Sequence, residues 1–153
     1  MKAYFMAEAI KEARQGIRIG DGGPFGCVIV KDNKIVGRGH NLVVSHNDPT
    51  AHGEITAIRD ACNNLNSFSL AGCELYTTAQ PCPMCLAAVL WAGIDRVYYG
   101  CNLEDTAEIG FNDIEFYQAL KGEKQLCSLE EISRADCLDL FAEYSRIKNK
   151  TMY

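Results

Sequence analysis

Two short motifs in the sequence combine the residue types that bind zinc and move protons. The first is His52-Gly53-Glu54, and the second, thirty residues further on, is Pro81-Cys82-Pro83-Met84-Cys85. His52, Cys82 and Cys85 would supply three zinc ligands, with the Glu54 carboxylate outside that set. A structural zinc is usually closed by four protein ligands, whereas a catalytic zinc keeps one position open for water. The motifs therefore predict one catalytic Zn²⁺ per chain.

The same residues indicate a hydrolytic reaction. Zinc lowers the pKa of a bound water towards about 7, so hydroxide becomes available at neutral pH. H-x-E followed by P-C-x-x-C resembles the described signature of zinc deaminases, and this resemblance implies that the hydroxide attacks a ring carbon that carries an amino group. Glu54 would act as the proton shuttle, first to a ring nitrogen and then to the departing amine. The predicted reaction releases ammonia from a cyclic amidine.

A structural zinc site is the alternative interpretation, because that is the usual meaning of a C-x-x-C pair. His46 or His40 would then be the fourth ligand, and the protein would be a zinc-stabilised interaction module without catalysis. A purely structural site needs no carboxylate at position 54. The pairing of the two motifs therefore favours the catalytic interpretation.

Each motif is expected to open a helix, the first over residues 51–65 and the second over residues 83–91. The positive partial charge of a helix N-terminus favours the thiolates that zinc requires. A spacing of three places Cys82 and Cys85 on one side of a helical turn. The second of these helices is apolar nearly all round, which predicts that it is buried.

The remaining pattern indicates one α/β domain over residues 1–153. Apolar periodicity predicts a helix over 2–18, and two strands joined by a turn at Asp32-Asn33 follow it. The full set of expected strands is 25–30, 34–41, 73–77, 96–99 and one near 125–127, and further helical segments lie within 104–122 and at 133–147. We expect a three-layer α/β/α fold with a central mixed five-stranded sheet.

The charge and the N-terminal sequence narrow the functional classes. The chain has 153 residues with 15 basic and 20 acidic side chains, a net charge of −5, which does not favour a polyanionic partner. Glu8, Lys11 and Glu12 interrupt the N-terminal apolar run, so it indicates neither a signal peptide nor a membrane span. These features predict a cytoplasmic protein that does not bind a membrane.

Eight cysteines in such a protein are more consistent with metal binding by one close pair than with disulfides. The other six lie in or beside apolar stretches. We expect them to be small core residues, namely Cys27, Cys62, Cys73, Cys101, Cys127 and Cys137.

The chain resembles the cytidine deaminase superfamily, and within it the bacterial guanine deaminase branch. H-x-E followed by P-C-x-x-C is the described signature of zinc deaminases. The resemblance covers nearly the whole chain and extends to the segments Gly22–Gly26, Asn47–Ala51, Glu74–Thr78 and Ala107–Asp113. It implies a cytidine deaminase-like fold, a homodimer, and conversion of guanine to xanthine and ammonia in purine catabolism or salvage.

The resemblance also implies which residues contact the base. Asn41 would hydrogen-bond it through its carboxamide, which offers both a donor and an acceptor. Asp113 would accept a hydrogen bond from guanine and relay protons. Phe25 would pack against the ring, and Trp91 would line the pocket. Each has a structural alternative: Asn41 in a turn, Asp113 as a helix cap, and the two aromatic residues in the core.

The C-terminal segment and two substitutions complete the comparison with that branch. Residues 145–153, ending in Tyr153, are expected to cover an active site, either their own or that of a dimer partner, and to expel water from it. Gly53 stands where alanine is frequent, and Asn112 stands where a second acid is expected beside Asp113.

Other substrates of the same chemistry remain open at this point. A tRNA adenosine deaminase would have nearly the same fold and motifs. The net charge and the acidic residues between 104 and 115 argue against it, because an editing enzyme needs a cationic path for the RNA backbone. A deaminase of another small ring, such as cytosine, a nucleoside or an aminotriazine, is the further alternative.

Overall fold

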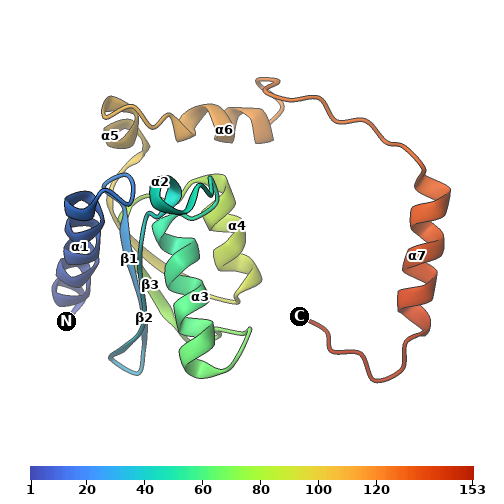
Figure 1. Cartoon of the computed structure of the whole chain (residues 1–153), viewed down its shortest axis with the longest axis horizontal. Helices are drawn as coiled ribbons and strands as arrows, with labels where there is room; N and C mark the ends of the chain where they lie inside the picture. The colour runs from blue at the N-terminus through green and yellow to red at the C-terminus, as the bar shows by residue number, and fades with distance from the viewer.

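A mixed four-stranded sheet forms the centre of the molecule, which the computed structural model describes over residues 1–153 (Figure 1). Its strands are β1 (Gly26–Lys31), β2 (Lys34–His40), β3 (Glu74–Ala79) and β4 (Arg96–Cys101), in the order β2-β1-β3-β4. β1 runs antiparallel to both β2 and β3, whereas β3 and β4 are parallel. The tight turn between β1 and β2 forms at Asp32 and Asn33, whose positive φ angles of 48° and 61° confirm that prediction.

Helices cover both faces of this sheet (Figure 1). α1 (Lys2–Ile19) packs on one face, and α3 (Gly53–Leu65) and α4 (Pro83–Trp91) pack on the other. Three short helices lie beyond one end of the sheet: α2 (Val43–His46), α5 (Leu103–Glu108) and α6 (Asp113–Leu120). The last helix, α7 (Arg134–Arg146), stands apart from the body. No helix has the length and apolar character needed to span a membrane.

The alternation of side chains along β1 explains the three layers. Val28 and Val30 point to the α1 face and pack with Phe5 and Tyr76, whereas Ile29 points to the opposite face. The second core contains the sheet residues Cys27, Ile29 and Leu75 together with Ala57 and Ala61 of α3 and Val89 of α4. The predicted α/β/α layering is therefore confirmed.

Gly39 allows β2 to lie directly against the first turns of α3. A Cβ atom at this position would meet the Thr56 hydroxyl and the backbone nitrogen of Ala57. The Thr56 hydroxyl lies 3.0 Å from the His40 carbonyl of β2 and 3.0 Å from the Gly53 carbonyl of its own helix, and these are its acceptors. This close approach fixes the start of α3 relative to the sheet.

The fifth strand predicted near Gln125–Cys127 is wrong. Residues 124–127 contain bends and pair with no strand, so β4 is left as an edge of the sheet. The segment Lys124-Gln125-Leu126-Cys127 has no β-branched or aromatic residue, and nothing local favours an extended conformation there.

The burial predicted for α4 is also wrong in part. Cys85 and Val89 are buried, but Leu90 and Trp91 are 69% and 73% exposed. An apolar surface on every side of this helix gave no indication of which side would face the core. Three of the six cysteines expected in the core are exposed as well: Cys101, Cys127 and Cys137.

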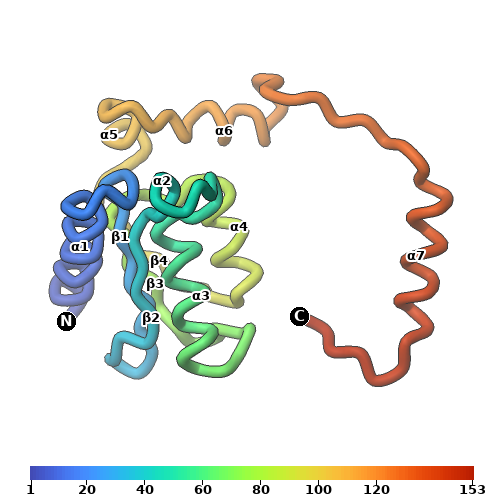
Figure 2. The backbone as a smooth tube through the Cα atoms, viewed as in Figure 1, coloured from blue at the N-terminus to red at the C-terminus, as the bar shows by residue number.

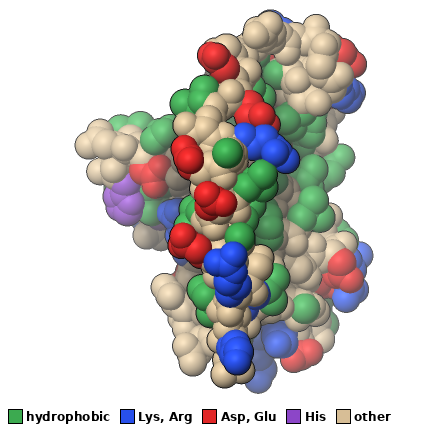
Figure 3. Space-filling view, turned by 90° about the vertical axis from the view of Figure 1, so that its right-hand side faces the viewer, with side chains coloured by type: hydrophobic (Ala, Val, Ile, Leu, Met, Phe, Trp, Pro, Cys, Tyr) green, Lys and Arg blue, Asp and Glu red, His purple; other side chains and the backbone are tan.

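Residues 121–153 form an arm that leaves the body (Figure 2). α7 within this arm has no buried residue. Figure 3 views the molecule from the side of α7 and shows hydrophobic side chains at the surface beside acidic ones. The chain then turns back, and the Tyr153 ring centroid lies 6.1 Å from that of Trp91 and 6.4 Å from that of Phe68.

We expect Gly39→Ala to destabilise the protein by about 1–3 kcal/mol, because the added methyl group meets backbone atoms of α3 that cannot move aside freely. Urea unfolding followed by circular dichroism measures the change. Lys34→Ala, at an exposed position of the same strand, is the control and should stay within about 0.5 kcal/mol of the wild type. An unchanged midpoint in the Gly39 variant would disprove the close-approach argument.

Candidate active site

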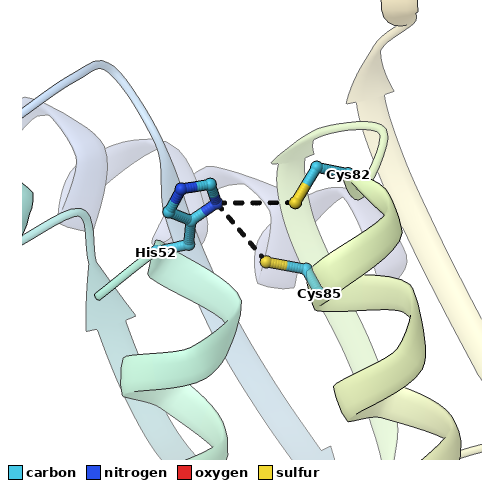
Figure 4. A group of neighbouring side chains, drawn as sticks. All are labelled: His52, Cys82 and Cys85. Carbon is cyan, nitrogen blue, oxygen red and sulfur yellow. Dashed lines mark hydrogen bonds between the residues drawn. The ribbon is translucent and has the colours of Figure 1, made fainter. Parts of the chain in front are cut away.

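Three metal-binding side chains converge from the starts of two helices (Figure 4). His52 is the N-cap residue of α3, Cys82 is the N-cap residue of α4, and Cys85 lies in the first turn of α4. The His52 Nδ1 atom lies 3.6 Å from the Cys82 Sγ atom and 3.5 Å from the Cys85 Sγ atom. The ligand set predicted from the sequence is therefore assembled in the fold.

These distances fit a tetrahedral zinc ion. Zinc bonds of about 2.3 Å to sulfur and 2.0–2.1 Å to nitrogen would hold the nitrogen and sulfur atoms about 3.6 Å apart in a tetrahedron. The fourth-ligand candidates of the structural-zinc alternative do not join the group. The His40 Nε2 atom instead lies 2.7 Å from the Asp21 Oδ2 atom, and His46 is exposed at the end of α2. The three side chains would hold a Zn²⁺ ion and leave one coordination position for water.

The two thiols share a hydrogen bond that favours the loss of one proton from the pair. A hydrogen bond from the Cys85 thiol holds the pKa of Cys82 well below its ordinary range, and this bond raises the pKa of Cys85. Cys82 is therefore a thiolate at neutral pH, the form in which cysteine binds zinc. Zinc binding then releases the remaining proton from the pair.

Glu54 lies beside the metal ligands without belonging to them. Its side chain, in the first turn of α3, is only 6% exposed. Burial raises the pKa of Glu54, and a hydrogen bond of 3.1 Å connects its Oε1 atom to the Thr77 hydroxyl. A carboxyl group with a raised pKa is suited to take and return a proton near neutral pH.

A cavity of about 240 Å³ opens next to these residues. Its walls include His52, Glu54 and Cys82, together with the predicted base-contacting residues Phe25 and Asn41, as well as Asp113. Sites for drug-sized ligands measure about 300–1,000 Å³. This cavity is smaller and has the size for one nucleobase.

Asn41 both shapes a turn and reaches the cavity. Its Oδ1 atom accepts a hydrogen bond of 3.1 Å from the Val43 backbone N–H. The backbone N–H of Asn41 donates to the Phe25 carbonyl at 2.9 Å. The side chain is buried and its carboxamide is fixed in orientation by the Val43 contact. The NH₂ group of that carboxamide has no partner within the protein and is available to a ligand.

Asp113 enters the cavity from α6, where it is the first residue. The N-cap of that helix is Asn112, and no side chain forms a capping hydrogen bond there, so Asp113 does not act as the cap. Burial raises the pKa of Asp113, and the charge of Cys82 adds to this effect. The Tyr117 hydroxyl donates to the Pro81 carbonyl at 2.6 Å and so connects α6 to the zinc-binding loop.

Two residues expected at the site do not reach this cavity within the chain. Trp91 lies at the opposite end of α4 from Cys82, and its side chain is largely exposed. Tyr153 lies beside Trp91. Neither residue lines the cavity.

Sequence reasoning missed several cavity residues, of which Phe111 is the most informative. Its ring meets that of Phe25 edge to face, with the centroids 4.9 Å apart. An aromatic residue two positions before Asp113 was the available signal. Val43 and Val44 also line the cavity, on the four-residue helix α2, which is too short to produce a recognisable periodicity.

The zinc-binding region of the cytidine and deoxycytidylate deaminases matches residues 1–101. The chain belongs to this family of zinc-dependent deaminases. It is 41% identical to guanine deaminase of Bacillus subtilis (strain 168). The alignment spans 151 residues and covers 97% of this chain and 97% of the relative. The X-ray structure of guanine deaminase from Bacillus subtilis matches with a TM-score of 0.93 at 40% identity, covering 99% of this chain and 98% of the other.

A tRNA-specific adenosine deaminase of Buchnera aphidicola subsp. Schizaphis graminum is 34% identical over 148 residues, 97% of this chain and 95% of the relative. These findings confirm the superfamily that the sequence motifs indicated. They also confirm the similarity to the guanine deaminase branch.

Cys85→Ser should weaken zinc binding by more than about 100-fold, since even loss of a residue that only supports a ligand costs 10–100-fold. After dialysis against a mild chelator, elemental analysis should find about one zinc per wild-type chain and little in the variant. Cys101→Ser, at an exposed cysteine outside the cluster, should keep its zinc. A full equivalent of zinc in the Cys85 variant would contradict the assigned ligand set.

Proposed function

We propose that this chain hydrolyses guanine to xanthine and ammonia. The observation that carries the proposal is the placement of Asn41 and Asp113 in one small cavity with Glu54 and the zinc ligands. These side chains offer a hydrogen-bond donor and an acceptor to a planar ring that carries a carbonyl and an amino group. The full-length similarity to a protein named guanine deaminase supports the same substrate.

The chemistry divides between the metal and Glu54. Zinc, when bound, makes a water molecule acidic enough to react near pH 7. Glu54 removes a proton from that water and delivers it to a ring nitrogen while the water oxygen bonds to the carbon that carries the 2-amino group. Glu54 then takes the remaining proton of the hydroxyl group formed at that carbon and delivers it to the amine, which leaves as ammonia while the oxygen becomes a carbonyl of xanthine.

The walls of the cavity orient the ring for this attack. The Asn41 NH₂ group donates to an acceptor of the base, and Asp113 accepts from the amino or ring N–H side. Phe25, supported by its edge-to-face contact with Phe111, packs against the ring. Holding the ring and the carboxylate in one geometry lowers the entropic part of the barrier.

The surface around the cavity favours a free base over tRNA. The helices next to it carry acidic residues in their first turns, Glu104 and Asp105 in α5 and Asp113 and Glu115 in α6. The chain as a whole has a net charge of −5. A phosphate backbone would approach these carboxylates without the lysines and arginines that usually neutralise it.

Ammonia release by the zinc-loaded protein tests the substrate. We expect turnover with guanine and none with adenine, cytosine, guanosine, an aminotriazine or tRNA. Glu54→Gln should keep its fold and its zinc but lose at least about 10²-fold to 10⁴-fold in kcat, the typical contribution of general acid–base catalysis. Activity on tRNA or on a different ring would refute the proposed substrate, and an active Glu54→Gln enzyme would refute the proton shuttle.

We also propose a homodimer in which the arm of residues 121–153 contributes to the interface. Several apolar side chains of the arm are exposed, among them Leu138, Leu140, Phe141, Tyr144 and Ile147. An isolated helix of this length is marginal in water, and exposed apolar surface of this kind usually has a partner. The body offers a matching apolar surface on and near α4, formed by Phe68, Leu86, Leu90 and Trp91.

The position of the C-terminus favours action across this dimer. Tyr153 lies near Trp91, which at a rise of 1.5 Å per residue is about 14 Å along α4 from Cys82 and about 9 Å from Cys85. The tail of residues 145–153 therefore does not cover the cavity of its own chain. A two-fold exchange of arms would bring each tail to the partner's body. Trp91 and Tyr153 would then contribute to the pocket of the partner chain, across the dimer interface.

Mixed dimers test the exchange. A chain that lacks Met152 and Tyr153 should lose at least about tenfold in guanine kcat/KM, because its cavity stays open to water. When it is co-purified through a second tag with Glu54→Gln chains, about half of the wild-type activity per dimer should return, since each mixed dimer has one complete site. A monomer in sedimentation analysis, or no recovery in mixed dimers, would rule out the exchange.

We propose the cytoplasm as the location of this enzyme. All eight cysteines are free, and two of them must remain reduced to bind the metal. Reduced thiols are maintained in the cytosol and are oxidised in secretory compartments.

A further inference from the structure

The carboxylate of Glu54 needs a fixed direction as well as a fixed position. Its side chain has rotatable bonds between the helix and the carboxylate, so the direction of the carboxylate depends on the hydrogen bonds that it accepts. Cys85 has no proton left to donate once it is a zinc ligand. Two donors then remain beside the Glu54 carboxylate: its own backbone N–H and the Thr77 hydroxyl, which lies 3.1 Å from Oε1 and is the one that comes from another element.

The location of Thr77 explains why it reaches Glu54. Thr77 and Leu75 point to the same face of β3, because side chains alternate along a strand, and Leu75 packs with Ala57 of α3. Thr77 is 1% exposed, and Glu54 belongs to the first turn of the same helix. The hydroxyl is therefore enclosed between the sheet and the start of α3.

The residue type at position 77 is unusual for its surroundings. Its neighbours on this face of the sheet are apolar, and valine would fill the same volume with the same β-branched shape. A buried hydroxyl is normally retained only with a partner, and the partner here is Glu54. The geometry thus relates the hydroxyl to the carboxylate and not to packing.

We propose that Thr77 is a positioning residue that orients the Glu54 carboxylate for proton transfer. The hydroxyl holds Oε1 and thereby limits rotation of the carboxylate about the last bond of the side chain. It donates to the ionised carboxylate and accepts from the protonated one, so it supports Glu54 before and after the proton moves. This inference rests on the proton-shuttle role proposed for Glu54.

Thr77→Val tests the proposal because it removes the hydroxyl and keeps the shape. We expect kcat for the deaminated ring to fall about 10- to 100-fold, because misplacing a catalytic group by about 1 Å costs up to about 100-fold. KM and zinc content should change little, since the hydroxyl contacts neither the ring nor the metal ligands. Thr77→Ser should recover most of the lost kcat.

A matched control separates orientation from the loss of any buried hydroxyl. Thr106 is 2% exposed, and its hydroxyl donates to the Asn102 carbonyl at 2.9 Å in α5. Thr106→Val should keep the wild-type kcat. If Thr77→Val does not fold, Thr77→Ser and Thr77→Ala give the same comparison, because they differ only in the hydroxyl, and the serine variant should be about 10- to 100-fold faster.

Two further results identify the residue through which Thr77 acts. Adding Thr77→Val to Glu54→Gln should cost no additional activity, because coupled residues are not additive. A crystal structure of Thr77→Val should show the Glu54 carboxylate turned from its wild-type orientation or in more than one orientation. An unmoved carboxylate, a wild-type kcat, a loss of zinc, or a serine variant as slow as the valine variant would overturn the proposal.

The failure of this inference is distinguishable from failure of the proposed function. A wild-type enzyme that deaminates another ring rejects guanine as substrate but leaves the comparison at position 77 in force with that ring. A wild-type enzyme active on guanine, with an equally active Thr77→Val variant, rejects only the role of Thr77. The crystallographic comparison needs no turnover at all.

Discussion

The architecture depends on holding one imidazole nitrogen and two sulfur atoms about 3.5 Å apart when they come from distant parts of the chain. α3 follows β2 and α4 follows β3, and both helices begin at the same end of the sheet. Because β1 pairs with both of those strands, the sheet sets the separation of the two helix starts. The close approach at Gly39 fixes the position of the start of α3 relative to β2. The backbone therefore sets the spacing of the three candidate ligands.

The same arrangement gathers negative charge in a small volume. The charge of Cys82 contributes to the raised pKa values of both Glu54 and Asp113, after burial as the main cause. A doubly charged cation at this point offsets the repulsion between the thiolates and the neighbouring carboxyl groups. The metal is thus part of the electrostatic balance of the site as well as a reagent, and the helix N-termini supply a smaller contribution of the same sign.

The sequence was sufficient where the determining interactions are local. The zinc ligands and the bounds of α4 follow from motif spacing and from Pro83 at the first helical position. The predictions of a fifth strand and of a fully buried α4 were wrong because strand pairing and the choice of a buried helix face depend on residues far away in the chain. Trp91 was predicted to line the cavity but does not do so within its own chain, because its position in the sequence does not show which way its side chain points. Phe111 was missed because its role arises only when α6 approaches Phe25.

The family match ends at residue 101, whereas Phe111 and Asp113 enter the cavity from beyond that point. The proposed metal ligands and Glu54 therefore lie in one continuous stretch of sequence, and one wall of the cavity lies in the next. A descendant of this gene could exchange the second stretch through recombination and keep the chemistry of the first. Substrate preference could then change while the metal ligands and Glu54 are retained.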